Sequence, residues 1–409
     1  MIRRRLVLVA TLCALLPPGL QGQQANPVAG PGLSLHDAID SALKNNFDVR
    51  AATSAADSAR AEMRIAGALP NPTFSSIPNT PFQYSATLPL DVGPQRTFRV
   101  RVSDLGARAA ESDVRESRRQ VVLAVHRAFF DVLLADARRE IVSARRDVML
   151  QVVAGDSARV HAGDLPERAL IRSQIEFIRA ETDRARADID ARSTRLALQG
   201  LMGLSVADTA LRIDGALVYR PVAFEPDDAA ILGISRRPDV LASRDRESQS
   251  AAAQQAARSL VLPVPQLSYV RQFNGPFDSG RYFALGLAFE MPILNQYRGQ
   301  RERASAAHEA AGYARRRIEA QAAREVQAAT LEFRAQQALV LRYEAGVIDR
   351  MQQNVDAARY AYSRGATSLL EVLDALRTQQ DMLTEYRTAL RDYWVAAYTV
   401  EATTGIPMR

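Results

Sequence analysis

The feature that most constrains this chain is an internal repeat, because landmarks of the first half recur in the same order about 200 residues later. Chance similarity between segments rich in Ala and Arg would not align proline and glycine in step. The matched landmarks are the Pro-x-Pro turns at 68–72 and 261–265, Gly163 with Gly365, and Gly203 with Gly405. Such self-similarity indicates two copies of one unit. We expect a first repeat at 33–203, a linker at 204–229 and a second repeat at 230–406.

Long stretches without proline predict very long helices in both repeats. Proline is absent between Phe98 and His161 and again between Gly299 and Arg364. At a rise of 1.5 Å per residue, each stretch would form a helix roughly 90–100 Å long, which cannot lie inside a globule. Narrow apolar stripes with much alanine are typical of antiparallel coiled coils. The other predicted helices are 35–67, 230–259, and return helices that end at Gly200 and Thr404.

Each repeat also contains two short segments in which apolar residues alternate with small or polar ones. In 282–291, the odd positions from Phe283 to Met291 are apolar and the even ones are mostly small. A period of two residues is typical of a strand with two unlike faces. Turn-forming residues separate the two segments of each repeat. The predicted hairpins pair 73–77 with 82–90 and 266–273 with 282–291.

The N-terminus has the pattern of a secretory signal peptide. Three arginines at 3–5 precede an apolar stretch at 6–16, and prolines and glycines then break it before residue 22. This order of charge, apolar core and small residues predicts a cleaved segment at 1–22. The chain's single cysteine, Cys13, lies inside that segment. The mature chain would then lack a disulfide, a cysteine metal site and a cysteine nucleophile.

Charge and histidine placement argue against several classes of function. The formal net charge is +6, but arginine and acidic residues are interspersed, so we expect a solvated helical surface and no nucleic-acid partner. Neither a phosphate-binding glycine loop nor a serine nucleophile elbow occurs. We therefore predict no catalysis, no cofactor and no metal site. The scattered histidines, none at paired ligand spacing, are His36, His126, His161 and His308.

If the mature chain crosses a membrane, it does so with strands, because no later segment has the ~18 apolar residues of a spanning helix. Open sheet edges are prohibitive in lipid. Four strands cannot close a barrel, since small barrels need about eight. A barrel would therefore be shared between chains, with eight strands from two or twelve from three. The alternative is that both hairpins cap a soluble coiled coil.

At this point the sequence resembles the TolC-like outer-membrane factors, and most closely their CzcC-like/CusC-like branch. The resemblance covers 33–406. Its most specific stretch runs from Tyr362 to Ala375 and reads YSRGATSLLEVLDA. Further matching stretches are 35–38 with 42–46, 68–72, and 292–295 with Gly299.

The resemblance implies a mainly helical fold with a small β part. It implies a homotrimer with a shared 12-stranded transmembrane β-barrel in outer-membrane lipid, four strands coming from each chain. It also implies a long periplasmic α-helical barrel and an equatorial belt. The expected function is a passive exit duct for small toxic compounds or metal cations, in a tripartite pump with a periplasmic adaptor and an inner-membrane pump of the resistance-nodulation-division (RND) class.

The resemblance also points to a periplasmic gate. In the family, acidic residues after a glycine turn ring the closed aperture, and the matching positions here are Glu371 and Asp374. Three copies of each would concentrate negative charge. Where well-studied members carry a locking arginine, this chain has Thr367, so we hypothesise that Arg168 of the other turn pairs with Glu371. The alternative is that both acids are solvated and favoured by the helix dipole.

The two helix turns are also the expected contact surface for the adaptor. Glycine permits a tight turn, and the apolar residues beside it lack an internal partner. A simple helix-hairpin turn is the alternative. The predicted docking residues are Gly163, Leu165, Gly365, Ser368 and Leu369. Two rival functions stay open, namely the duct of a type I protein secretion system and a periplasmic coiled-coil scaffold without a pore.

Overall fold

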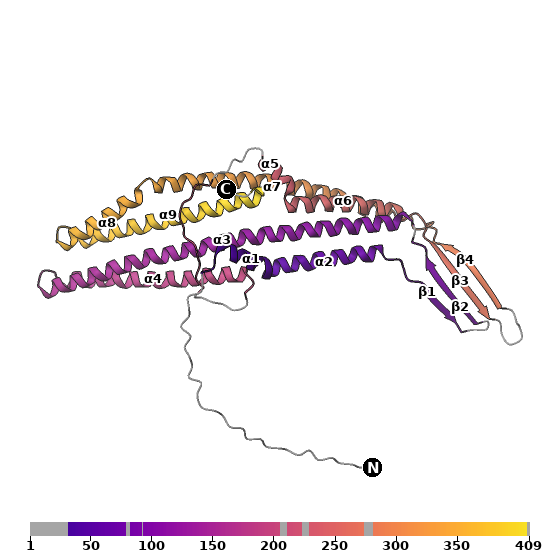
Figure 1. Cartoon of the computed structure of the whole chain (residues 1–409), viewed down its shortest axis with the longest axis horizontal. Helices are drawn as coiled ribbons and strands as arrows, with labels where there is room; N and C mark the ends of the chain where they lie inside the picture. The colour runs from indigo at the N-terminus through magenta and orange to yellow at the C-terminus, as the bar shows by residue number, and fades with distance from the viewer. Residues whose placement is uncertain are drawn as a thin grey trace, which may run out of the picture.

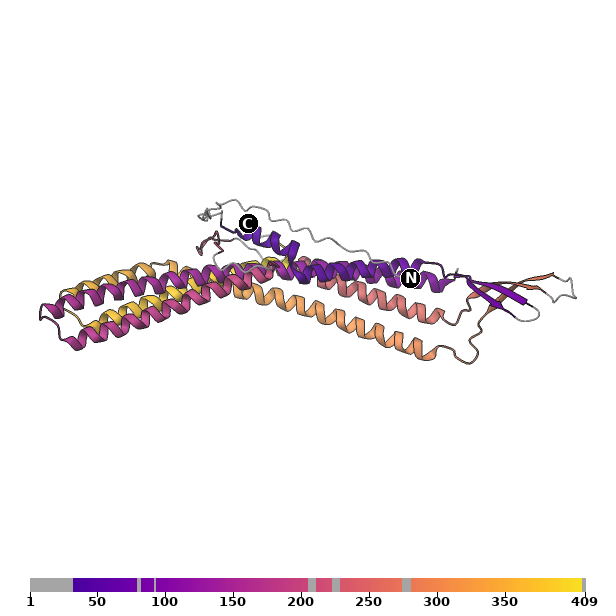
Figure 2. The ribbon, with the colours of Figure 1, turned by 90° about the horizontal axis from the view of Figure 1, so that it is seen from below.

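The computed structural model describes residues 32–78, 82–91, 93–204, 211–222, 229–273 and 281–406. The described part is a long, slender body with four strands at one end, two helix turns at the other and helices between them (Figures 1 and 2). The predicted signal peptide at 1–22 lies outside the described residues.

The first half contains one very long helix, α3 (Pro94–His161), which packs against α2 (Phe47–Gly67) along its first part and against α4 (Glu167–Leu201) along its last part (Figure 1). A further helix, α1 (Leu35–Asn45), precedes α2. The single helix predicted at 35–67 is wrong, because the chain turns at Asn46. The Asn46 side chain accepts a 2.8 Å bond from the Asp48 amide and donates a 2.9 Å bond to the Leu201 carbonyl, which caps α2 and ties it to α4.

The second half follows the same order, with one more break. Its helices are α5 (Ala229–Arg236), α6 (Pro238–Ser259), α7 (Arg298–Glu344), α8 (Val347–Ser363) and α9 (Leu369–Thr404). The uninterrupted helix predicted from Gly299 to Arg364 is wrong, because Gly346 adopts φ +89° and separates α7 from α8. Among the described residues, no helix combines the length and apolar character needed to cross a membrane.

The strands form one antiparallel sheet in the order β1-β2-β3-β4. The strands are β1 (Thr73–Ile77), β2 (Phe82–Pro89), β3 (Pro265–Phe273) and β4 (Arg281–Phe289). Both hairpins therefore lie where the alternation of residues predicted them. The central pairing of β2 with β3 places Leu88 opposite Leu267 and joins the two halves of the chain.

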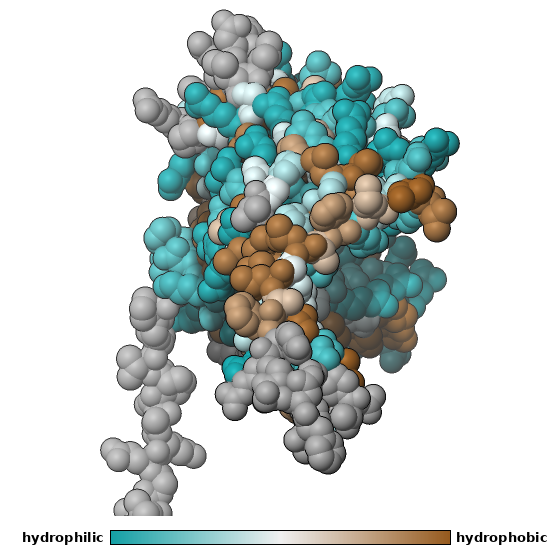
Figure 3. Space-filling model, turned by 90° about the vertical axis from the view of Figure 1, so that its right-hand side faces the viewer, coloured by the Kyte–Doolittle hydropathy of each residue, from teal (hydrophilic) through white to brown (hydrophobic). Residues whose placement is uncertain are grey.

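The two faces of the sheet differ sharply in character. By register, one face carries large apolar side chains that are well exposed, such as Phe283 (72%) and Leu285 (69%). Brown side chains gather over the sheet in Figure 3. The opposite face carries mostly small or amide side chains, with Ile77 and Val270 as apolar exceptions. Its other members include Ser75, Ser85, Thr87, Gln266, Ser268, Ala284 and Gly286.

The main core lies halfway along the body, where α3 and α9 cross. Tyr393 is fully buried, and its ring lies 5.5 Å from Phe333. Its hydroxyl donates a 2.8 Å bond to the Arg220 carbonyl, so it also holds the segment between the two halves. Trp394 stacks on Phe130 at 5.9 Å. The aromatic residues of α9 therefore pack this core.

Candidate functional site

The two helix turns at the end remote from the sheet share one backbone design. Gly163 and Gly365 both have positive φ, +82° and +72°, directly after a helix C-cap. In each turn the next amide bonds back five residues, from Asp164 to the Arg159 carbonyl and from Ala366 to the Ala361 carbonyl, both at 2.9 Å. This is the Schellman closure, which satisfies the last carbonyls of a helix. Both turns are therefore tight and rigid in backbone.

The predicted docking residues lie at these turns. Gly163, Gly365 and Ser368 are exposed, whereas Leu165 and Leu369 are half-buried. Leu370, next to them, is 59% exposed. The turns thus present backbone and a few apolar side chains at the extreme end of the body, where a partner could reach them.

The predicted gate acids lie at the start of α9. Glu371 and Asp374 are exposed, and the Thr367 hydroxyl donates a hydrogen bond to the Glu371 carboxylate within the same turn. Arg168 is exposed at the start of α4 and makes no ion pair within the described part of the chain. The described residues of one chain form no bond between Arg168 and Glu371, and their pairing in the assembled channel stays a prediction.

A different pair of residues joins the two helical hairpins near this end. The Tyr362 hydroxyl of α8 donates a 2.8 Å hydrogen bond to Asp156 Oδ1 of α3. Asp156 is only 1% exposed, and its Oδ2 has no hydrogen-bond partner among the described residues. The Arg159 guanidinium lies 5.7 Å from the centre of the Tyr362 ring. A hydrogen bond to a buried carboxylate is strong. Removal of the Tyr362 hydroxyl would leave the Asp156 carboxylate buried without a donor, which is unfavourable.

The surroundings of this pair favour the neutral phenol. Burial, followed by the hydrogen bond and charge of Asp156, raises the pKa of Tyr362 well above its ordinary value, and Arg159 opposes this in part. One turn away, Arg359 donates a 2.6 Å bond to Gln151, also from α8 to α3. An apolar cluster packs beside both bonds and consists of Met149, Ala180, Val355, Val372, Ala375 and Leu376.

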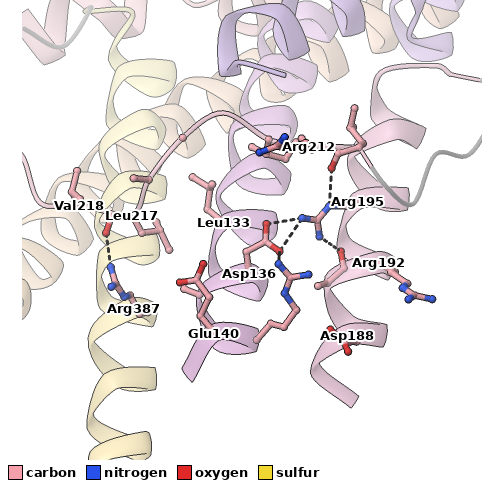
Figure 4. A pocket seen from close by; sticks show the side chains of 17 residues that line it. Leu133, Asp136, Glu140, Asp188, Arg192, Arg195, Arg212, Leu217, Val218 and Arg387 are labelled. Carbon is pink, nitrogen blue, oxygen red and sulfur yellow. Dashed lines mark hydrogen bonds and ion pairs between the residues drawn. The ribbon is translucent and has the colours of Figure 1, made fainter. Parts of the chain in front are cut away.

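A polar hollow of about 930 Å³ lies beside the middle of the body, between α3, α4 and the segment 211–218 (Figure 4). Arg195 crosses it, donating to both Asp136 oxygens at 2.9 and 2.7 Å and to the Leu211 carbonyl at 2.9 Å. From α9, Arg387 donates to the Leu217 carbonyl at 2.9 Å. These bonds hold the 211–218 segment on the helices, so the hollow has a structural explanation. Within the described ranges, no His, Cys, Asp and Glu cluster could hold a metal ion.

Comparison with known proteins decides what this architecture belongs to. Residues 38–204 match the family described as outer membrane efflux protein. The cobalt-zinc-cadmium resistance protein CzcC of Cupriavidus metallidurans is 25% identical over 392 residues, which cover 92% of this chain and 91% of CzcC. The first half of the chain thus matches the outer membrane efflux protein family, and the likeness to CzcC spans nearly all of the chain.

Solved structures of outer-membrane channels share the fold of this chain. The Campylobacter jejuni CmeC outer membrane channel superposes with a TM-score of 0.80 at 16% identity, covering 91% of this chain and 85% of CmeC. CusC, described as forming a transmembrane channel, gives 0.77 at 20% identity, covering 90% and 91%. The channel OprN gives 0.77 at 18% identity, covering 91% and 89%. The fold is thus TolC-like.

This efflux protein is an outer-membrane channel component that extends into the periplasm. Sequence reasoning had reached this family, but it missed the pair of Asp156 and Tyr362. The signal available was a polar residue shortly before each turn glycine, seven residues before Gly163 and three before Gly365. Pairing the two residues requires the register between the hairpins, which a single sequence does not reveal.

Proposed function

We propose that three copies of this efflux protein form the passive exit duct of an RND-type tripartite pump, with divalent metal cations among its cargo. The observation that carries the proposal is the sheet with one apolar and one polar face, at one end of a long helical body that ends in two tight helix turns at the other. A relative named for cobalt, zinc and cadmium resistance aligns with 92% of the chain, which supports the metal cargo. The proposal assigns the chain no catalytic reaction.

The edges of the sheet favour a shared barrel. Strands β1 and β4 are the two edges of the sheet among the described residues, so each pairs on one side there. In lipid the unpaired backbone groups of an open edge are very unfavourable, so β4 of one copy would pair with β1 of the next. Three copies would contribute twelve strands, with the apolar face toward lipid and the small, polar face toward the lumen.

An exposed apolar seam on α4 supports association of the helical parts. The apolar residues of this seam are separated by four, three, eleven and seven positions, so they lie on one stripe of the helix. Ile178 and Ile189 are 62% and 65% exposed. A stripe of this kind needs a partner helix, and a neighbouring copy supplies one. The seam consists of Ile171, Ile175, Ile178, Ile189 and Leu196.

The end that carries the two helix turns would act as the gate. In a trimer, three links between Asp156 and Tyr362 would hold α8 against α3, while Glu371 and Asp374 would ring the aperture with negative charge. Thr367 would position Glu371. Arg168 lies at the start of α4, beside the first turn, and in the trimer it would pair with Glu371 of a neighbouring copy. The exposed turns around Gly163, Leu165, Gly365, Ser368 and Leu369 would meet the periplasmic adaptor.

Two experiments test the proposed duct. Purified protein in planar bilayers should give discrete single-channel conductance, and a scaffold without a pore would give none. A strain that lacks the chain should become more sensitive to cobalt, zinc or cadmium, and the wild-type chain should restore resistance. Unchanged sensitivity to metals, dyes and antibiotics, combined with loss of a secreted protein, would replace the proposal with type I secretion.

A further inference from the structure

Arg271 is a cation on the apolar face of the sheet. By register, Arg271 of β3 is opposite Tyr84 of β2 and Phe283 of β4, and it shares its face with Tyr269 and Phe273. The other described side chains of this face are apolar, aromatic or hydroxylic, and none is a carboxylate. An arginine among apolar residues that face lipid is unfavourable unless its charge reaches a polar partner.

The position of Arg271 along the strands makes such a partner accessible. Arg271 lies two residues before Phe273, the last residue of β3, whereas Leu267 lies near the first residue of the strand. The end of β3 points away from the helices (Figure 1). Aromatic rings surround this far end. The Tyr84 ring is 5.1 Å from Phe82 and 5.4 Å from Phe273. Rings gather where a membrane-spanning strand meets the headgroup region.

The arginine itself is held by this ring group. Its guanidinium lies 5.0 Å from the centre of the Phe273 ring, within the range of a cation–π contact. Arg271 is half-buried, so the aliphatic stem is covered while part of the head stays accessible. No described residue forms an ion pair with it, which leaves guanidinium donors for an external anion. Arginine binds phosphate with two parallel hydrogen bonds.

We propose that Arg271, framed by Phe82, Tyr84 and Phe273, binds the phosphate of a lipid headgroup in the outer-facing leaflet. The site would anchor each copy at a fixed depth and stabilise the assembled barrel. This inference rests on the outer-membrane placement of the sheet, and it is independent of the gate and of the cargo.

The test compares lipids and variants in the assembled channel. The protein is reconstituted in nanodiscs of a phosphate-free galactolipid that contain either bisphosphorylated or dephosphorylated lipid A, and the apparent Tm is measured. The phosphorylated lipid should raise the Tm of the wild type by about 2–4 °C. Arg271→Gln should lose this shift and Arg271→Lys should keep part of it. Arg101→Gln, at an exposed position of α3, should keep all of it.

Two further arms separate the sources of phosphate and the causes of failure. Inorganic phosphate added to nanodiscs with dephosphorylated lipid should not raise the Tm, because the site is built at the lipid surface. Single-channel conductance of Arg271→Gln should equal that of the wild type, so loss of the shift would not reflect loss of the duct. An equal Tm shift in the wild type, Arg271→Gln and Arg101→Gln would overturn the proposal.

Discussion

Tyr362 donates a 2.8 Å hydrogen bond to Asp156, and this single bond joins a tip helix of the second half to the long helix of the first. The two residues are 206 positions apart in sequence. Because Asp156 is buried and its second oxygen has no partner within the described residues, the phenol is the only hydrogen-bond donor to this carboxylate there. Without the phenol, the Asp156 carboxylate would be more stable in contact with water than buried between the helices.

Replacing Tyr362 with Phe should therefore open the helical end. A hydrogen bond to a charged group contributes about 1.5–3 kcal/mol, so its loss in each copy should raise the open fraction at least about tenfold. Single-channel recordings would measure this as longer and more frequent openings. The matched control is Tyr360→Phe, because Tyr360 is 64% exposed on the same helix and its ring lies 5.5 Å from the Arg364 guanidinium. Equal opening in both variants would mean that the bond does not hold the gate.

Stability should fall in mild acid because of His126. Its ring stacks on Tyr398 at 3.9 Å and donates a 2.8 Å bond to the Val122 carbonyl. Burial lowers the pKa of His126 below 6.5, and the bond to Val122 opposes this in part. The folded state thus disfavours the proton, so the contribution of His126 is complete above pH 6.5 and is lost as the pH falls through the lowered pKa.

Thermal unfolding between pH 8 and pH 5 would measure this loss, with an upper limit of about 1.4 kcal/mol per pH unit for each copy. His126→Gln can still donate to Val122 and should flatten the dependence on pH. His36→Gln serves as control, because His36 is exposed beside Asp40. A slope that survives in His126→Gln would assign the acid sensitivity to other groups.

Local patterns predicted the elements of this fold well, and their failures have physical causes. Alternation located all four strands, and glycines located both turns at the tips. The break at Asn46 depends on a bond to the Leu201 carbonyl, which lies 155 residues away. Gly346 is a single glycine among strong helix formers, and one glycine is tolerated inside many helices.

The candidate site was less accessible to sequence reasoning. Glu371 and Asp374 came from family resemblance, and their role at the aperture stays a prediction. The bond from Arg168 to Glu371 was predicted from opposite charges on two turns. Within one chain, Glu371 instead accepts a hydrogen bond from the Thr367 hydroxyl of its own turn. The pair of Asp156 and Tyr362 could not be predicted, because helical periodicity does not fix how one hairpin lies against another.

Replacing Gly346 with Ala should destabilise the junction of α7 and α8. Nothing lies within 4 Å of an added Cβ, so the penalty comes only from φ +89° and should be about 1–2 kcal/mol. Gly155→Ala is a matched control, because that glycine lies inside α3 with equally open surroundings. There alanine should stabilise the helix by up to about 1 kcal/mol. Chemical denaturation of the two variants should give shifts of opposite sign, and equal shifts would contradict the strain at Gly346.

Replacing Ile178 with Glu should weaken assembly of the trimer. Ile178 lies in the middle of the exposed seam on α4, and burial of an isoleucine against a neighbouring copy is worth about 1.5–3 kcal/mol. A glutamate at this position would lose that term and also require desolvation of its charge. Arg184→Gln lowers the charge by the same one unit at an exposed position of α4 that lies away from the seam, five and six residues from its nearest members. Light scattering after size-exclusion chromatography should show fewer trimers for Ile178→Glu only. If both variants assemble like the wild type, the seam faces solvent, and the contact between copies lies on another helix.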